Sequence, residues 1–476
     1  MASVSNAFDT TAIELAGLRD RIGELIGPRD PGYDEARAIW NGAIDRRPGA
    51  IARCSSVAEV VEAVRFARER GLLVSVRGGG HGVGGFAVCD EGLVIDLSPL
   101  KRISVDPAAG QATAGAGVLW GELDAATQRD GLATVGGIVT HTGIGGLTLG
   151  GGIGWLMRKH GATVDNLLAV ELVTADGERL TVSGDEHPDL FWGIRGAGAN
   201  FGVVTSFTYR LHQVGPTVLA GPAYYPLAEA REVLRGYREA IAEAPEELTT
   251  ILTLRRAPPV PYLPEAVHHE PVVAVGACYA GALERGAEVV RRLKQLGTPI
   301  ADLLQARPYT ELQSMFDAAV PHGWRYYWKS IEAPALTDAA IDTLIEQTTA
   351  VTSPNSYCIV FQLGGAIARA GAGETAFCQR QPGHDVNINA VWTAEDGDGA
   401  RHVAWCRRFF DAILPHAREC VYLNFLGDEG QERIRAAYDA DRFDRLVALK
   451  RRHDPDNFFR ANQNISPAID LPGDFK

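Results

Sequence analysis

A histidine that directly follows a run of glycines is the side chain in this sequence best suited to chemistry. The segment reads Arg77-Gly78-Gly79-Gly80-His81-Gly82. Glycines reach positive φ and let a ligand approach the main chain closely, and successive amides in such a turn form a nest for an anion such as a pyrophosphate. A neutral imidazole beside this nest is a nucleophile held close to whatever the nest binds.

Two other kinds of glycine loop are alternatives. A Rossmann loop follows a strand and opens a helix. A strand is predicted over residues 72–76, but residues 82–86 read Gly-Val-Gly-Gly-Phe and lead to a second predicted strand over 93–97. The Rossmann interpretation is therefore disfavoured. A P-loop is excluded, because no glycine run leads into Gly-Lys-Ser or Gly-Lys-Thr.

A second glycine-rich stretch covers residues 131–154 and contains ten glycines. A flexible linker would be polar, whereas this stretch also carries Ile138, Val139, Ile144, Leu147, Leu149 and Ile153. A buried glycine-rich backbone needs a partner for its amides. A large, flat ligand with a polar tail would supply one.

Taken in chain order, five segments resemble the berberine-bridge-enzyme-like branch of the vanillyl-alcohol-oxidase/PCMH flavoproteins. Residues 77–82 resemble the flavin-attachment loop, 131–154 the second FAD loop and 196–205 the segment facing the adenine end. Residues 422–425 resemble a catalytic motif, and 455–465 the C-terminal return to the FAD domain. The resemblance covers nearly the whole chain and implies FAD as the cofactor.

The resemblance implies a covalent bond from His81 to the 8α-methyl carbon of FAD. Doubly linked members carry a cysteine where this chain has Val139, so a monocovalent flavin is expected. His141 and Thr142 lie in the loop that the family places near the flavin ring, and ordinary structural roles are the alternatives for both. The other cofactor-binding residues implied are Arg77, Gly78, Gly79, Gly80, Gly82, Val139, Thr140, Gly145, Gly146, Gly150, Gly151, Gly154, Gly202, Val203, Val204, Asn462 and Asn464.

The residues expected to be catalytic are Tyr422, Asn424 and Thr142. Many members read Tyr-x-Asn-Tyr, and the second tyrosine acts as the base on the substrate hydroxyl. This chain has Phe425 at that position, so the base is Tyr422, a group from the substrate sheet, or no side chain. A phenol with a pKa of about 10 acts as a base only if nearby cations lower that pKa.

Local patterns predict the elements that position these residues. Ser56 and Glu59 form a capping box before a helix that Gly71 ends. Asp176-Gly177 predicts a hairpin. Beyond Pro216, strands are expected over 248–254, 272–277, 358–363 and 386–392, and helices over 227–244 and 283–296.

The expected fold is α+β, with a PCMH-type FAD-binding domain made of two small α/β subdomains and an antiparallel-sheet substrate domain with helices. The FAD-binding domain is expected over residues 1–214 (core about 46–214), the substrate-binding domain over 215–420, and the C-terminal return to the FAD domain over 421–476.

One face of the substrate sheet should roof the flavin. Alternation places residues 357, 359 and 361 on one face and 358, 360 and 362 on the other, and the pattern leaves open which face that is. Asn387 and Asn389 could contact substrate, although solvent-facing positions are the more common outcome for such residues. The aromatic and basic cluster at 324–329 is expected to be a surface patch, with a place in the pocket as the alternative.

Composition restricts the remaining possibilities. The formal net charge of −13 disfavours nucleic-acid and anionic-membrane partners, and no apolar run is long enough to span a bilayer. Residues 1–5 lack the features of a secretory signal. Seven scattered cysteines favour reduced thiols in the cytoplasm over disulfides or a metal site. No particular oligomeric state is predicted.

The resemblance implies an oxidase. A hydride would pass from a small organic substrate (an alcohol, an amine or a polyketide-like aromatic) to the covalently bound flavin, and O2 would reoxidise the flavin with release of H2O2. Because of Phe425 and Thr142, two alternatives stay open. One is a flavin-dependent oxygenase of specialised metabolism, and the other is a dehydrogenase that does not use O2. A non-catalytic flavin-binding protein is the alternative from another class.

Overall fold

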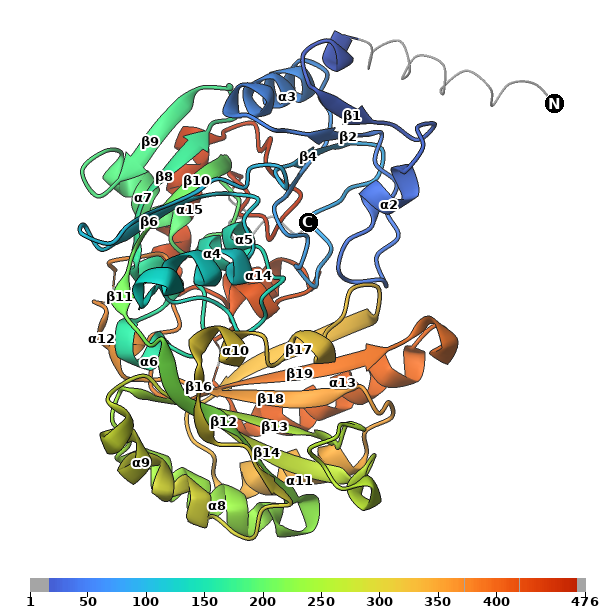
Figure 1. Ribbon diagram of the computed structural model, residues 1–476. Helices are drawn as coiled ribbons and strands as arrows, with labels where there is room; N and C mark the ends of the chain where they lie inside the picture. Colours follow the sequence, from blue (N-terminus) through green and yellow to red (C-terminus); the bar gives the residue numbers. More distant parts are fainter. Residues whose placement is uncertain (1–16, 372, 419, 469–476) are drawn as a thin grey trace, which may run out of the picture.

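The computed structural model describes residues 17–371, 373–418 and 420–468. Residues 1–5, which the sequence predicts to carry no secretory signal, lie outside this range. Helices combine with sheets of four, five and eight strands and a two-stranded ribbon of β7 (Leu132–Ala133) and β11 (His212–Gln213). The fold is α+β, as the sequence predicts (Figure 1).

The first sheet delivers the glycine run that precedes His81. Its order is β1 (Glu24–Ile26), β2 (Ala50–Arg53), β4 (Leu93–Asp96), β3 (Val74–Arg77), and β2, β4 and β3 are parallel. Helix α3 (Val57–Glu69) connects β2 to β3, and the Ser56 hydroxyl accepts a hydrogen bond from the Glu59 amide at its start, as predicted. The glycines therefore follow the carboxyl end of a buried strand, on a rigid support.

The second sheet is antiparallel and carries the other two glycine-rich segments. Its order is β5 (Ile103–Asp106), β6 (Gln111–Gly115), β10 (Val203–Arg210), β8 (Leu167–Val173), β9 (Arg179–Ser183). The hairpin between β8 and β9 turns at Gly177, whose φ of 72° is in the left-handed region, as the Asp-Gly pair predicts. Beside this sheet lie α4 (Trp120–Thr127), α5 (Ile144–Leu149) and α7 (Pro188–Ile194), whereas α6 (Met157–His160) packs against α12 (Ala366–Arg369).

The third sheet has eight antiparallel strands. Its main path is β15 (Ala301–Asp302), β12 (Thr217–Pro226), β14 (Pro271–Tyr279), β13 (Leu248–Arg256), β18 (Tyr357–Gln362), β19 (His384–Trp392), β17 (Arg325–Ala333), and β16 (Gln305–Pro308) pairs with β12. Helices α8 (Ala230–Ala242), α9 (Leu283–Arg291), α11 (Asp338–Thr349) and α13 (Ala400–Ile413) cover its outer face (Figure 1). Its other face turns toward the first two sheets.

The segment 324–329 corrects one expectation from the sequence. Residues 325–329 begin strand β17 at the edge of the eight-stranded sheet, and Tyr326 is buried beneath Trp40. The preference for a surface patch was wrong, because the aromatic side chains at 326 and 328 alternate onto the inner face of a strand that the periodicity did not reveal.

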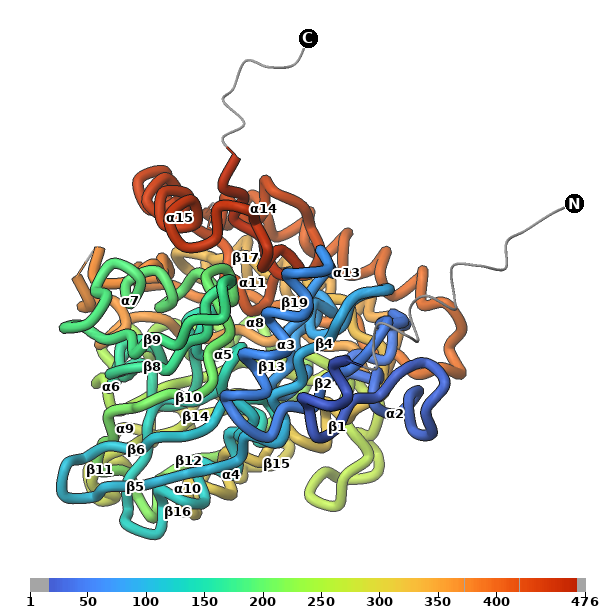
Figure 2. Tube along the Cα trace, turned by 90° about the horizontal axis from the view of Figure 1, so that it is seen from above, coloured from blue at the N-terminus to red at the C-terminus, as the bar shows by residue number. Residues whose placement is uncertain are grey.

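The last helices bring the chain back to the first part of the fold. Helix α15 (Ala440–His453) packs against α7, and α14 (Gln431–Arg435) precedes it (Figure 2). Leu446 and Val447 of α15 join the same apolar core as Trp192 and Ile194 of α7. The segment after α15 then runs back toward the glycine-rich loops.

Asp124 joins the first part of the chain to the eight-stranded part. Its carboxylate in α4 is buried and accepts a hydrogen bond of 2.9 Å from Gln313 Nε2 at the end of α10 (Tyr309–Gln313). Burial raises the pKa of Asp124 to about 7. Between about pH 4 and pH 7 the folded state thus holds a proton that the unfolded state releases, so stability falls as the pH rises, by up to about 1.4 kcal/mol per pH unit.

Replacing Asp124 with Asn should remove this pH dependence. The variant keeps the acceptor for Gln313 but does not titrate, so its stability relative to the wild type should rise from pH 5 to about pH 7 and level off above that. Denaturant unfolding at four pH values measures this relative stability. The exposed Asp130 serves as the control, since Asp130→Asn should leave the pH profile unchanged. Parallel profiles for wild type and Asp124→Asn would contradict the prediction.

Candidate active site

A cavity lies where the glycine-rich loops face the inner side of the eight-stranded sheet. Its wall also includes Trp40, part of the segment 422–426 and residues 459 and 461–463. Most of the residues expected from the sequence line it, namely Gly78, Gly79, Gly80, His81, Gly82, Val139, Thr142, Gly145, Gly146, Gly202, Val204, Tyr422, Asn424 and Asn462. The structure therefore brings together residues from five separate parts of the chain.

Other expected residues lie behind this wall. The Arg77 guanidinium forms a buried ion pair of 2.7 Å with Asp96, and Thr140 donates a hydrogen bond to Asp317. Six further expected residues also do not line the cavity: His141, Gly150, Gly151, Gly154, Val203 and Asn464. These side chains and glycines support the cavity from outside.

Two of the glycine-rich loops touch backbone to backbone. A Cβ atom on Gly79 would lie 2.4 Å from the amide nitrogen of Gly143, and a Cβ on Gly143 would meet Gly79 equally closely. No side chain fits between the loops, so glycine is required at both positions. The contact places the main chains of residues 78–82 and 143–146 side by side along the cavity.

The His81 ring is held by aromatic neighbours. Trp40 stacks on it with ring centroids 4.1 Å apart, and Tyr326 stacks on the other side of Trp40 at 3.7 Å. His81 Nε2 lies 3.1 Å from His141 Nδ1. Nothing in the sequence pattern indicated Trp40, since it lies forty-one residues before His81 and outside every motif.

The His81 imidazole is neutral at physiological pH. Burial, together with the neighbouring His141 and His322, lowers its pKa well below the ordinary value for histidine. Because Nε2 is engaged with His141, Nδ1 is the nitrogen that remains for a bond to a ligand. A neutral, oriented imidazole of this kind is a competent nucleophile.

Tyr422 and Asn424 form a hydrogen-bonded unit at the base of the cavity. Asn424 Nδ2 donates to the Tyr422 hydroxyl (2.8 Å) and to the Leu147 carbonyl (2.9 Å), and the Gly152 amide also donates to the Tyr422 hydroxyl (2.9 Å). Burial nevertheless raises the pKa of Tyr422 above its ordinary value. The lowered pKa that a phenol base requires is not found here.

Phe425, at the position where the sequence motif would have its second tyrosine, belongs to an aromatic cluster. The Phe425 ring lies 4.7 Å from that of Tyr422, 5.6 Å from Phe361 and 5.7 Å from Trp328. All four rings line the cavity. Phe425 therefore contributes apolar surface to the cavity wall and supplies no hydroxyl there.

The structure shows which face of β18 meets the cavity. Tyr357, Ile359 and Phe361 line it, while Cys358 and Val360 pack under the outer helices. On the neighbouring strand Asn387 and Asn389 are each 1% exposed and also line the cavity. The preference for solvent-facing asparagines was wrong, because both faces of β19 are covered: Ile388 and Ala390 pack under α13, and Asn387 and Asn389 face the cavity.

Asp385 is a buried acid that the sequence reasoning missed. It precedes Asn387 and Asn389 at the same period-two spacing, which is the signal that could have revealed it. Its carboxylate accepts hydrogen bonds from Ser330 (3.0 Å) and Gln379 (3.1 Å), and burial raises its pKa to about 7. It does not line the cavity.

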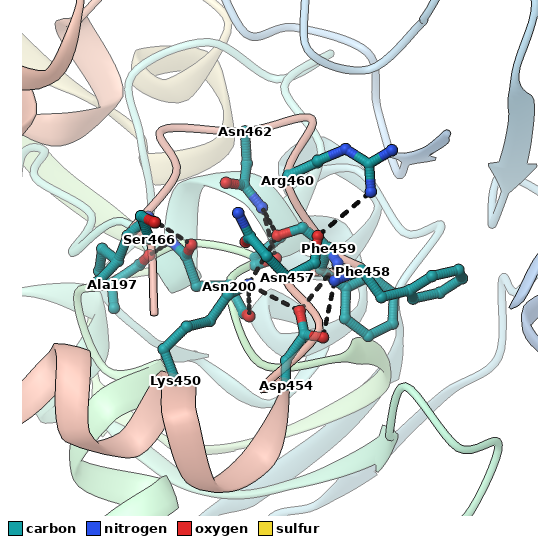
Figure 3. Close-up of polar contacts among 12 residues, drawn as sticks. Ala197, Asn200, Lys450, Asp454, Asn457, Phe458, Phe459, Arg460, Asn462 and Ser466 are labelled. Carbon is teal, nitrogen blue, oxygen red and sulfur yellow. Dashed lines mark hydrogen bonds and ion pairs between the residues drawn. The ribbon is translucent and has the colours of Figure 1, made fainter. Parts of the chain in front are cut away.

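A buried lysine fixes the C-terminal part of the wall (Figure 3). Lys450 Nζ donates to the carbonyls of Asn200 and Phe459 (2.7 Å each) and to the Asp454 carboxylate (2.8 Å). Asp454 in turn accepts from the amides of residues 458 and 459. Asn462 donates to the Ala199 carbonyl at 2.9 Å. These bonds hold the segment 458–463 against the loop at 197–202.

Comparison with known proteins places this geometry among flavoproteins. Residues 48–183 match the family model for an FAD binding domain, and residues 421–466 match the model described as berberine and berberine like. An FAD-linked oxidoreductase from Dictyostelium discoideum is 32% identical, with 90% of this chain and 91% of the relative covered. The (R)-6-hydroxynicotine oxidase of Paenarthrobacter nicotinovorans is 31% identical, with 94% and 97% covered.

A solved structure agrees over the same length. The crystal structure of 6-hydroxy-D-nicotine oxidase from Arthrobacter nicotinovorans superposes with a TM-score of 0.85 at 30% identity and covers 94% of this chain and 98% of that one. The fold and the glycine-lined cavity define an FAD-dependent oxidoreductase with a PCMH-type FAD-binding domain. The chain belongs to the berberine-bridge-enzyme-like family of FAD-linked oxidoreductases. No helix in the described ranges is long and apolar enough to cross a membrane.

The residues present fit FAD. The Gly79–Gly143 contact leaves main chain, with no side chain in between, along one side of the cavity, which suits a pyrophosphate and a flat ring system. The buried Oδ1 of Asn462, at the cavity wall, has no hydrogen-bond partner among the described residues. The two glycine loops, residues 198–204 and Asn462 would hold the cofactor, with His81 beside it.

Proposed function

We propose that this enzyme is an oxidase whose FAD is held by a single covalent bond to His81. It would oxidise a small organic substrate (an alcohol, an amine or a polyketide-like aromatic), with O2 as the electron acceptor and H2O2 as the second product. The observation that carries the proposal is the neutral His81 imidazole at the cavity wall, hydrogen-bonded through Nε2 to His141. The oxidases among the relatives support it.

The chain's own groups would bind and orient. The two glycine loops would hold FAD, which would supply the hydride acceptor and the means of passing electrons on to a final acceptor. Tyr357, Ile359 and Phe361 cover the cavity from the sheet side and exclude water. With Phe425 apolar and the Tyr422 pKa raised, we propose that Tyr422 and Asn424 orient substrate and that no phenolate takes its proton.

The same proposal assigns the parts of the chain. Residues 1–214 would bind FAD, with a core of about 46–214, residues 215–420 would bind substrate, and residues 421–476 would return to the FAD-binding part. Tyr422, Asn424 and Thr142 remain the proposed catalytic residues, and each lines the cavity.

An anaerobic experiment followed by admission of air tests the proposed reaction. Candidate substrates are added to the flavin-loaded enzyme without oxygen, and flavin bleaching is recorded. Air should then restore the yellow colour with one H2O2 for each flavin. Bleached flavin that stays reduced in air would show a dehydrogenase, and reoxidation with oxygen found in the product would show an oxygenase. No bleaching by any substrate class would favour a flavin-binding protein.

We predict that His141 is needed for fast attachment of the flavin. When His81 Nδ1 forms its bond, the ring must lose the proton on Nε2, and His141 Nδ1, at 3.1 Å, is placed to accept that proton. His141→Gln keeps a hydrogen-bond acceptor but removes the base, so attachment should slow by about 10²-fold, at the low end of general-base effects. The ratio of acid-stable to total flavin, followed over time and pH, measures this.

The control for His141 is the other histidine of the cluster. His322 contacts His141 at 5.1 Å between centroids but does not form the bond to His81. His322→Gln should therefore leave the attachment rate within about twofold. Equal rates for His141→Gln and the wild type would remove His141 from the attachment step.

A further inference from the structure

The sheet side of the cavity carries polar atoms with no protein partner. Asn387 Nδ2, Asn389 Oδ1 and Trp328 Nε1 are buried and form no hydrogen bond in the described part of the chain. All three residues line the cavity. Leaving a buried donor or acceptor unpaired is costly, so these atoms indicate a ligand that pairs with them.

The hydrogen bonds of Asn389 fix the orientation of the side-chain amides of both asparagines. Asn389 Nδ2 donates to the main-chain carbonyl of Asn387 (2.9 Å) and to Asn387 Oδ1 (2.6 Å). A main-chain carbonyl only accepts, so the nitrogen of Asn389 must face it, and Asn389 Oδ1 points elsewhere. Asn387 Oδ1 must then accept from Asn389, which leaves its NH2 group free. The wall thus offers one fixed acceptor beside one fixed donor.

The surroundings of this donor and acceptor are aromatic and uncharged. Trp328 and Tyr357 are the cross-strand neighbours of Asn389 on either side, and Ile359, Phe361 and Phe425 continue the wall. Among the described residues that line the cavity, none is Asp, Glu, Lys or Arg, and the lowered pKa keeps His81 neutral. A charged substrate group bound against this part of the wall would lose its hydration without a counter-charge from the residues around it.

We propose that this wall selects an uncharged, flat aromatic substrate that carries a hydrogen-bond acceptor next to a donor, as in a lactam or a hydroxy-carbonyl aromatic. The substrate acceptor pairs with the Asn387 amide and the Trp328 indole N–H, and its donor pairs with Asn389 Oδ1. The inference rests on the proposed function and narrows its substrate class. It favours the aromatic class over amines that are protonated at physiological pH.

Calorimetric binding of matched probes to the flavin-loaded enzyme tests this selection. 2-Quinolone presents a carbonyl next to an N–H, N-methyl-2-quinolone lacks the donor, and protonated 1-naphthylmethylamine is a cation of similar size. Binding of 2-quinolone should be at least about tenfold tighter than that of either of the others, as expected for one buried hydrogen bond. Equal affinity for all three, or tighter binding of the cation, would overturn the proposal.

A substitution of Asn389 should reverse the preference for 2-quinolone over the cation. At pH 8, above the raised pKa of about 7 that burial gives the neighbouring Asp385, Asn389→Asp places a carboxylate in the wall, and Asn387 must turn its NH2 group toward it. 2-Quinolone should then bind about tenfold more weakly and the cation about tenfold more tightly. Asn387→Ala removes the donor, while Asn389 Nδ2 keeps its bond to the main-chain carbonyl of residue 387, so both quinolones should bind more weakly and the cation should be unaffected. Unchanged probe affinities in both variants would also overturn the proposal.

These results are separate from the test of the oxidase proposal. Probe binding requires neither turnover nor a covalent bond. An enzyme that discriminates among the probes but releases no H2O2 with any substrate would contradict the oxidase and leave the substrate class intact. An enzyme that releases H2O2 but binds all probes equally would support the oxidase and contradict the proposed substrate class.

Discussion

Replacing His81 with alanine is expected to abolish covalent flavin completely while leaving part of the FAD bound. The ring nitrogen that forms the bond is lost, but the glycine-lined wall, including the Gly79–Gly143 contact, is main chain and remains in place. After acid precipitation the yellow colour should move from the pellet to the supernatant. The intact protein mass should fall by one FAD in addition to the side-chain change.

His160 provides the matched control for this experiment. Its ring is also neutral, since burial lowers its pKa to about 3, but it stacks on His212 and lies outside the cavity wall. His160→Ala should keep acid-stable flavin on His81. Acid-stable flavin in His81→Ala, on a cysteine or on any other residue, would contradict both the site and the single link that Val139 implies.

Replacing Lys450 with methionine is expected to destabilise the protein by about 3–5 kcal/mol, the cost of breaking a buried ion pair by removing one partner. Lys450 and Asp454 are both fully buried, and Lys450 also satisfies the carbonyls of Asn200 and Phe459. The substitution leaves the buried Asp454 carboxylate without its counter-charge and removes the lysine hydrogen bonds to the two carbonyls. Denaturant unfolding measures the loss, and flavin retention should fall with it, since the same segment carries Asn462 in the cavity wall.

Two further variants identify the cause. Adding Asp454→Asn to Lys450→Met removes the buried charge that lacks a counter-charge and keeps an acceptor for one of the two amides at 458 and 459, so it should recover part of the stability. Lys101 pairs with Glu122 on the surface, and Lys101→Met should cost less than about 1 kcal/mol. A Lys450→Met protein as stable as Lys101→Met would show that the buried pair contributes little.

The sequence alone determined the features that depend on local backbone chemistry. Positive φ at Gly177 and the close approach of main chains at Gly79 and Gly143 require glycine, so the loops are visible as glycine runs. The capping of α3 by Ser56 and four of the eight strands of the large sheet, β13, β14, β18 and β19, follow from short-range pattern. His81 could be found from the sequence because the glycines that surround it in space also precede it directly in the chain.

Tertiary structure alone decided how distant segments meet. A period-two pattern shows that Tyr357 and Cys358 face opposite ways, but only the packing of the outer helices shows that Tyr357 faces the cavity. Trp40 stacks on His81, and Lys450 pairs beneath residues 458–459, through contacts across the fold that leave no periodicity. The amide orientations of Asn387 and Asn389 depend on a single main-chain carbonyl. Such contacts depend on three-dimensional neighbours, which composition and spacing do not encode.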